Sequence, residues 1–359
     1  NGENGALLLE PSRKNGNANS EYFSGTGFGI VAATATPNAT TSPEGVTNAT
    51  SFVGAASTAE HIIYTTGSST YNSDTTISIF AKANGYDYFV LGAGAQSANK
   101  PVLFNLANGT KIGNFTGWSS YSAPIDSGIE DYGNGWYRLS VTFAATSGTN
   151  TNMFFGSLPT GSVASGANSS TQNSIDGSFI FGAMIEAGSY ATSYIPNHGT
   201  SGGVTRAADS CSVTGASDVI GGTSGTIFFD VVMNESLTNT NYKQFFYYTD
   251  SSANQTYMFV SSANYIVGNP NLGNITSSTQ LQAGERYKIA VTYATNSFKM
   301  YVNGSQDATS SSGTPVDNEN ILSIGSYSGS SEFNEFGFKQ YAHFKEVLSD
   351  SELATLTTL

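Results

Sequence analysis

The chain has 359 residues, a length typical of about two domains, and only 11% of them are charged, with a formal net charge of -13. Contact with nucleic-acid phosphates needs clustered basic side chains, and the 13 lysines and arginines form no cluster, so nucleic acid is excluded as a partner. The sequence contains no apolar run of about 18 residues, which excludes membrane insertion through a helix, and its 12% aromatic content argues against disorder.

The first half of the chain contains short apolar runs separated by Gly, Asn, Ser and Pro, a pattern typical of β-sandwiches. The runs predict strands at residues 6–10, 27–33, 50–55, 61–65, 75–83, 86–93 and 102–106. The first of them is expected to open this sandwich. Asn84-Gly85 and Asn108-Gly109 each predict a hairpin, because both central positions of a type I′ turn need positive φ.

The clearest strand is at residues 136–143, where alternate residues are apolar. Leu139 and Val141 fall on one face with their aromatic neighbours, and this face is expected to be core. Residues 286–293 repeat the pattern, with Val291 in the position of Val141. The sequences that flank the two segments are not similar to each other. We therefore interpret the similarity as two separate sandwiches with the same packing requirement, and not as an internal repeat.

Residues 179–209 mark the boundary between two domains. A strand-like run at residues 179–186 is followed by Pro196, which cannot donate to a central ladder, and then by Gly199, Gly202 and Gly203. Extended structure restarts at Val204. The prediction is one domain at residues 1–203 and another at residues 204–359.

The second domain shows the same kind of strand pattern. Strands are predicted at residues 225–233, 243–249, 256–260, 287–292, 298–304, 320–325 and 336–344. Ser349 and Glu352 form a capping-box pattern, which predicts one short C-terminal helix. The predicted fold class is all-β, with two tandem antiparallel β-sandwiches of the jelly-roll type.

Residues 186–196 (EAGSYATSYIP) and 205–209 (TRAAD) carry a resemblance to a known family. These segments resemble bacteriophage tail, fibre and other virion-surface proteins, in which such a stretch joins a carbohydrate-binding-module-like sandwich to a concanavalin A-like (laminin-G-like) domain. Residues 5–13 and 135–143 resemble the same family, and residues 298–304 resemble the laminin-G-like signature that ends Tyr-Val-Asn-Gly.

The resemblance implies a non-enzymatic protein of the virion surface, in a tail fibre, spike or capsid appendage, that binds host-surface polysaccharide. Other virion subunits, and further copies of the chain in a homo-oligomer, are the implied protein partners. Cys211 is the only cysteine, so no intramolecular disulfide can form, which fits assembly in a reducing cytoplasm. Two alternatives stay open: a purely structural decoration or assembly protein of the particle, and a secreted bacterial polysaccharide-active protein.

Sugar recognition would use exposed aromatic rings that stack on pyranose rings, with amide and carboxylate groups nearby for the hydroxyls. Trp118 and Tyr121, in a Gly/Ser-rich loop, are the candidates in the first domain, although Trp118 could equally fill the end of the sandwich. The candidates in the second domain are four tyrosines: Tyr247, Tyr248, Tyr257 and Tyr265. By alternation, about half of these four are expected in the core.

Acidic residues suggest bound structural calcium at two places, Asp126, Glu130 and Asp131 in one segment and Asp317 with Glu319 in another. The simpler interpretation is that they are solvated loop acids. His61, His198 and His343 show no metal-ligand spacing, and the carboxylate alternation of jelly-roll glycanases is absent. We therefore predict no catalytic residues, while a Tyr/His/Arg cluster assembled from distant strands, as in polysaccharide lyases of the concanavalin-like fold, stays open.

Overall fold

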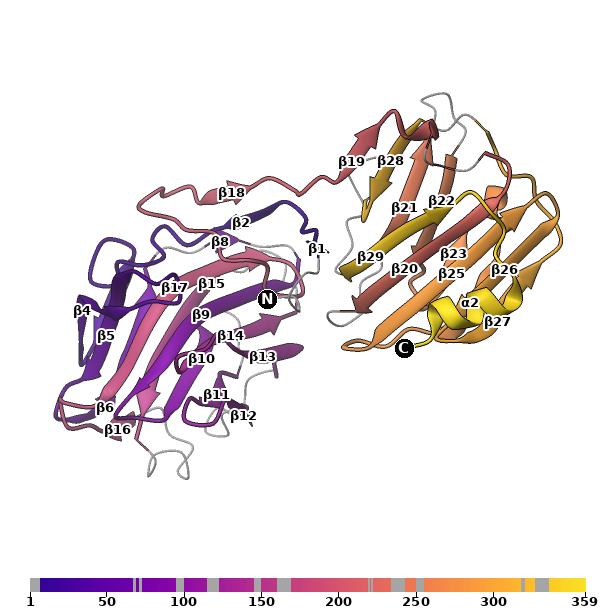
Figure 1. Cartoon of the computed structure of the whole chain (residues 1–359). Helices are drawn as coiled ribbons and strands as arrows, with labels where there is room; N and C mark the ends of the chain where they lie inside the picture. The colour runs from indigo at the N-terminus through magenta and orange to yellow at the C-terminus, as the bar shows by residue number, and fades with distance from the viewer. Residues whose placement is uncertain are drawn as a thin grey trace. The chain divides into compact units, whose positions relative to one another are not determined.

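The computed structural model describes residues 7–66, 69–70, 73–94, 100–114, 123–144, 150–159, 169–218, 220, 222–233, 243–249, 255–317, 320–326 and 336–359. The chain divides into two compact units (Figure 1). One is Arg13–Arg206, and the other is Ala207–Leu359 together with the N-terminal residues up to Ser12. Both are built from antiparallel sheets, which confirms the predicted all-β fold. In the described part of the chain, no helix is long and apolar enough to cross a membrane.

The unit Arg13–Arg206, called the first sandwich below, contains two large sheets with the core between them. One has the order β12 (Thr110–Asn114), β11 (Val102–Asn105), β10 (Tyr88–Gly94), β15 (Asn150–Leu158), β7 (Ile62–Thr65) and β3 (Phe28–Val31), with β8 (Ser69–Thr70) paired to β15. The other has the order β13 (Asp126–Asp131), β14 (Trp136–Phe143), β9 (Thr75–Asn84), β17 (Gly177–Ala187), β5 (Thr47–Gly54) and β4 (Ala33–Thr41). Two small ribbons pair β6 (Thr58–Glu60) with β16 (Ser169–Thr171) and β2 (Arg13–Asn15) with β18 (Val204–Arg206).

The other unit, called the second sandwich, repeats this architecture. Its first sheet has the order β1 (Leu7–Leu8), β29 (Phe336–Phe344), β20 (Gly225–Met233), β25 (Arg286–Ala294), β26 (Ser297–Val302) and β27 (Ser305–Ser310). Its second has the order β19 (Ser212–Thr214), β28 (Ile321–Ile324), β21 (Lys243–Thr249), β22 (Gln255–Val260), β23 (Tyr265–Gly268) and β24 (Thr276–Gln280). Two 3₁₀ turns, η1 (Ala216–Asp218) and η2 (Pro270–Leu272), lie in the connections.

The C-terminal helix α2 (Asp350–Thr357) has the predicted capping box. The Glu352 backbone N–H donates to the Ser349 hydroxyl, and the Ser349 backbone N–H donates to the Glu352 carboxylate. Leu353 of this helix is fully buried against Phe228 and Tyr301, on the outer side of the first sheet of the second sandwich.

The two strands with the alternating pattern, β14 and β25, are buried on both faces and not on one face only. Val141 and Val291 have no exposed surface, as alternation predicts. Thr142 and Thr292 on the opposite face are only 3% and 2% exposed, because further chain covers the outer side of each sheet. The Thr142 hydroxyl, for example, donates to the Ser189 carbonyl of the segment that follows β17.

That segment is held to the sheet by Glu186, which is fully buried. Its carboxylate accepts hydrogen bonds from the Thr192 backbone N–H (2.9 Å) and the Thr192 hydroxyl (2.7 Å). Arg138 donates to the Thr192 carbonyl, and the Arg13 Nε lies 3.7 Å from the Glu186 carboxylate. Burial raises the pKa of Glu186, against the opposing effect of the Thr192 hydrogen bonds and the two arginines. The residues that carry the family resemblance therefore have a structural role.

Two expectations about strand pairing are wrong, and one is confirmed. Asn84-Gly85 does not join a hairpin, because β9 and β10 belong to different sheets. The run at residues 6–10 does not open the first sandwich, because β1 pairs with β29 of the second sandwich, Leu7 opposite Phe338. The hairpin at Asn108-Gly109 is confirmed by the pairing of β11 with β12.

Candidate functional site

The outer face of β21, β22 and β23 in the second sandwich carries a group of aromatic side chains, which we call the aromatic row: Tyr247, Tyr257, Phe259 and Tyr265. Tyr247 lies directly opposite Tyr257, and their ring centroids are 6.2 Å apart at 27°. The ring centroids of Tyr257 and Phe259 are 6.0 Å apart. Tyr257, Phe259 and Tyr265 are partly exposed, whereas Tyr247 is only 4% exposed.

The inner face of the same strands belongs to the core. Met258 and Val260 alternate with Tyr257 and Phe259 and are fully buried or nearly so. Tyr248, one of the predicted sugar-binding tyrosines, is 1% exposed and packs in this core. It cannot present a ring face to a ligand in this structure. The partly exposed members of the aromatic row are therefore the candidate surface in this domain.

Polar side chains border the aromatic row. Tyr265 pairs with Gln280 and Val267 pairs with Thr276, and both polar partners on β24 are exposed. Gln255 is partly exposed two residues before Tyr257 on the same face of β22. Aromatic rings with amide and hydroxyl groups beside them suit a sugar, because the rings contact its C–H face and the polar groups bind its hydroxyls.

The other predicted site residues are distributed over both sandwiches. Trp118 and Tyr121 lie outside the described residues, in the stretch between β12 and β13. Asp126, Glu130 and Asp131 are exposed along β13, which is a strand and not the predicted loop. Asp126 and Asp131 accept hydrogen bonds from the backbone N–H groups of Ser127 (2.8 Å) and Gly133 (2.7 Å).

These acids are spread along an extended strand. Asp126 and Glu130 are four residues apart, a separation of about 13 Å in a strand that rises about 3.3 Å per residue. Asp317 is exposed, and Glu319 lies outside the described residues. Across the described residues, no three His, Cys, Asp or Glu side chains come together as a metal site. Structural calcium stays a prediction.

Sequence reasoning missed a cluster of phenols around His343 in the second sandwich. The Nδ1 of His343 lies 2.9 Å from the Tyr248 hydroxyl, and its Nε2 lies 2.7 Å from the Tyr293 hydroxyl. The Tyr248 hydroxyl also contacts the Tyr341 hydroxyl. The sequence shows Tyr341 and His343 two residues apart on β29. Their partners Tyr248 and Tyr293 lie on two other strands, β21 and β25, whose positions beside β29 cannot be read from the sequence. Tyr248 and Tyr293 are 1% and 4% exposed, so the cluster belongs mainly to the core.

The other two histidines have different surroundings. His61 is 2% exposed, and its ring nitrogens contact the carbonyl oxygens of Ala32, Ser57 and Ser170. It therefore has a structural role. The His198 side chain is 68% exposed, with its Nε2 3.9 Å from Glu21.

The His343 cluster predicts a dependence of stability on pH. Burial, with a smaller effect of the Lys345 charge, lowers the pKa of His343 from 6.5 to about 4. As the pH falls, His343 takes up a proton in the unfolded state near pH 6.5, before it does so in the folded state near pH 4. The contribution of neutral His343 to the free energy of unfolding is therefore complete above pH 6.5 and is lost as the pH falls towards 4. The loss reaches about 3 kcal/mol in the free energy of unfolding. Urea denaturation across this range should show a shallower decline for His343→Gln than for the wild type, whereas His198→Gln should decline like the wild type. Equal slopes for the wild type and His343→Gln would contradict the assignment.

Comparison with known proteins finds one family model that is similar to part of the chain. Residues 212–354 match the laminin-G-like family model described as the concanavalin A-like lectin/glucanases superfamily. The second sandwich is therefore similar to domains of the concanavalin A-like, laminin-G-like type. No curated protein matches the chain.

Several solved structures show partial similarity. A heptameric SAP-like pentraxin from Limulus polyphemus is 16% identical, with 38% of this chain and 70% of that chain covered and a TM-score of 0.30. The CBM40 of the Ruminococcus gnavus IT-sialidase is 14% identical, with coverages of 38% and 83% and a TM-score of 0.29. A variant of human galectin-16 is 12% identical, with coverages of 38% and 95% and a TM-score of 0.27.

Proposed function

We propose that this chain is a non-enzymatic virion-surface protein, part of a tail fibre, spike or capsid appendage, that binds host-surface glycans through its β-sandwiches. Other virion subunits, and further copies of the chain, are its proposed protein partners. The observation that carries the binding function is the aromatic row on a domain similar to those of the concanavalin A-like, laminin-G-like type. The virion location rests on the sequence resemblance of residues 186–196 and 205–209.

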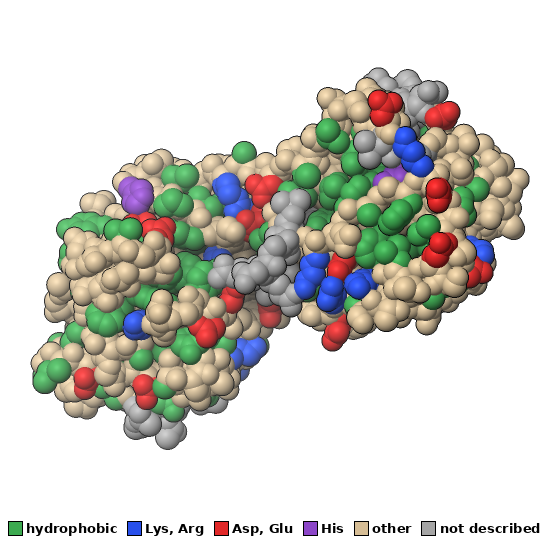
Figure 2. Space-filling model, viewed as in Figure 1, with side chains coloured by type: hydrophobic (Ala, Val, Ile, Leu, Met, Phe, Trp, Pro, Cys, Tyr) green, Lys and Arg blue, Asp and Glu red, His purple; other side chains and the backbone are tan. Residues whose placement is uncertain are grey.

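The surface chemistry supports a sugar ligand over a charged polymer. Figure 2 shows single or small groups of charged side chains among a mostly uncharged surface on the viewed face of each unit. A thinly charged polar surface with partly exposed tyrosines suits hydroxyl-rich ligands, which are bound by ring contacts and neutral hydrogen bonds.

The environment of the buried carboxylates supports binding without catalysis. Glu186 is engaged by Thr192 and lies beside Arg13 and Arg138. Asp230, 4% exposed, accepts two hydrogen bonds from Arg286, at 2.8 and 2.6 Å. Acid catalysis of glycoside cleavage needs a carboxyl group that can reach the substrate. Incubation with host polysaccharides should release neither reducing ends nor unsaturated products, and either product would contradict the proposal.

Tyr257→Ala tests the aromatic row. Loss of the ring should weaken binding of the full chain to immobilised host polysaccharide about tenfold, equivalent to about 1.4 kcal/mol, because a stacking surface is removed. The melting temperature should change little, because the core-facing residues of β22 are untouched. Tyr64→Ala, which removes a 38% exposed ring from the first sandwich, is the matched control and should bind as the wild type does.

The two results must be considered together. A large fall in the melting temperature of Tyr257→Ala would assign the ring to folding. Unchanged binding and stability would exclude Tyr257 and leave Tyr265, Trp118 and Tyr121 as the remaining predicted aromatic candidates. Trp118→Ala is the corresponding variant there.

A further inference from the structure

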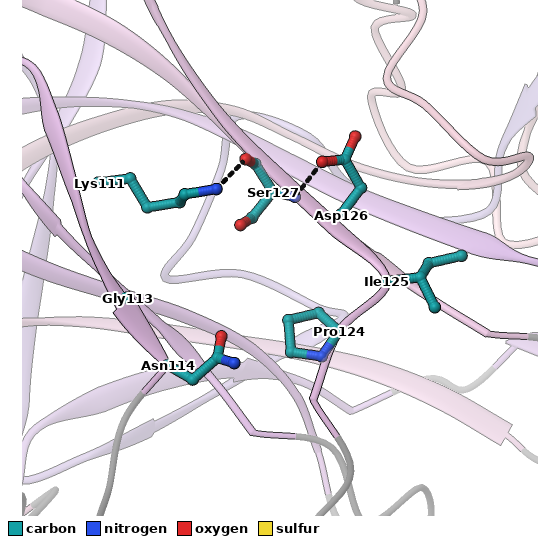
Figure 3. Close-up of a pocket in the computed structure, with 7 residues that line it drawn as sticks. All are labelled: Lys111, Gly113, Asn114, Pro124, Ile125, Asp126 and Ser127. Carbon is teal, nitrogen blue, oxygen red and sulfur yellow. Dashed lines mark hydrogen bonds between the residues drawn. The ribbon is translucent and has the colours of Figure 1, made fainter. Parts of the chain in front are cut away.

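A pocket of about 270 Å³ lies on the lateral side of the first sandwich (Figure 3). It forms where β12, the edge strand of one sheet, meets β13, the edge strand of the other. This volume is just below the roughly 300 Å³ at which small-molecule sites begin, so the pocket would take one sugar ring at most and no longer segment. Its lining residues are Lys111, Gly113, Asn114, Pro124, Ile125, Asp126 and Ser127.

One side of the pocket is polar and held in place. The Lys111 ammonium donates to the Ser127 carbonyl across the two edges (3.1 Å), and the Ser127 N–H donates to the Asp126 carboxylate (2.8 Å), as Figure 3 shows. An ammonium has three protons and a carboxylate about four acceptor positions, so both groups can bind further partners. Asn114, which is exposed, adds an amide that donates and accepts. Ammonium, carboxylate and amide groups of this kind can hydrogen-bond to sugar hydroxyls.

The other side is apolar. Ile125 is 53% exposed, but its side chain points away from Lys111 and Asn114 in Figure 3. The ring of Pro124 is the apolar side chain that lines the pocket on the side of Asn114. Such side chains can contact the C–H face of a pyranose ring, which lowers the apolar area in water. The pocket therefore combines a hydrogen-bonding side with an apolar side.

We propose that this pocket binds one neutral sugar residue of a glycan and gives the chain a second carbohydrate site, separate from the aromatic row. The inference rests on the proposed glycan-binding function. Lys111 and Asp126 balance each other in charge, and the chain has a net charge of -13, so a polyanionic glycan would be repelled. Two sites on one chain would also strengthen attachment to a repetitive surface through multivalency.

The test measures binding of neutral glycans by the full chain carrying Asp126→Ala or Asn114→Ala. Each variant should lose about tenfold in affinity, because a group that binds a hydroxyl is removed. Both side chains are exposed, so the melting temperature should not change. Glu130→Ala, an exposed acid on the same strand outside the pocket, is the matched control and should retain full affinity.

The outcomes separate this inference from the proposed function. Full affinity in both pocket variants, with reduced affinity in Tyr257→Ala, would overturn the second site and leave glycan binding in place. Failure of the wild type to bind any glycan would contradict the proposed function itself. If Asp126→Ala and chelation of divalent cations abolish binding while Asn114→Ala has no effect, Asp126 holds a cation and the inference is wrong.

Discussion

Val291→Asp should abolish soluble expression of the second sandwich. Val291 has no exposed surface and lies in the core between the two sheets, opposite Ile227 of β20. An uncompensated buried charge costs about 3–5 kcal/mol, a large part of the roughly 5–15 kcal/mol that stabilises a domain. Val141→Asp should have the same effect on the first sandwich, where Val141 is equally buried.

Soluble yield and urea denaturation measure this effect. Thr295→Asp is the matched control, because it adds the same charge four residues further on, at an exposed position after β25. It should behave as the wild type does. Thr142 and Thr292 cannot serve as tolerant controls, since both are buried. Soluble, fully stable Val291→Asp would mean that the faces of β25 are assigned wrongly.

Glu186→Ala should have the second largest effect. The substitution removes the acceptor of both Thr192 hydrogen bonds and leaves Arg138, which is 7% exposed, without its neighbouring carboxylate. Removing one partner of a buried charged group costs about 3 kcal/mol or more. The free energy of unfolding of the first sandwich should fall by this amount.

Two variants accompany Glu186→Ala. Glu186→Gln retains an acceptor oxygen and should recover part of the loss, whereas Glu130→Ala, at an exposed acid of the same sandwich, should change stability by less than about 0.5 kcal/mol. If Glu186→Ala were as stable as Glu130→Ala, residues 187–195 would be held to the sheet by other contacts.

Local patterns in the sequence were sufficient to predict most strands. The predicted bounds of β14, β20, β21 and β29 agree with the observed ones, because each strand is a short run rich in aromatic and apolar residues. The pairing of strands was harder to predict from the sequence than their positions. Asn84-Gly85 has the composition of a hairpin, yet the chain crosses there from one sheet to the other, which depends on contacts distant in sequence. The two residues of β1 contain no information about their partner on β29.

The candidate site could be predicted only in part. Four tyrosines were identified by type, but a register shift in β21 between Gln244 and Phe246 changes which residues point inward, and Tyr248 becomes core. Phe259 was missed, although it follows Tyr257 at the spacing that places both on one face. The pocket between β12 and β13 depends on two sheet edges that meet only in the folded sandwich, so no spacing in the sequence could reveal it.

A glycan array probed with the full chain tests the central claim most directly. The proposal predicts specific retention on host-surface glycans with neutral sugars, reduced by Tyr257→Ala and unchanged by Tyr64→Ala. Retention on no glycan, by a chain shown to be folded from its melting transition, would contradict it and favour a structural decoration or assembly protein.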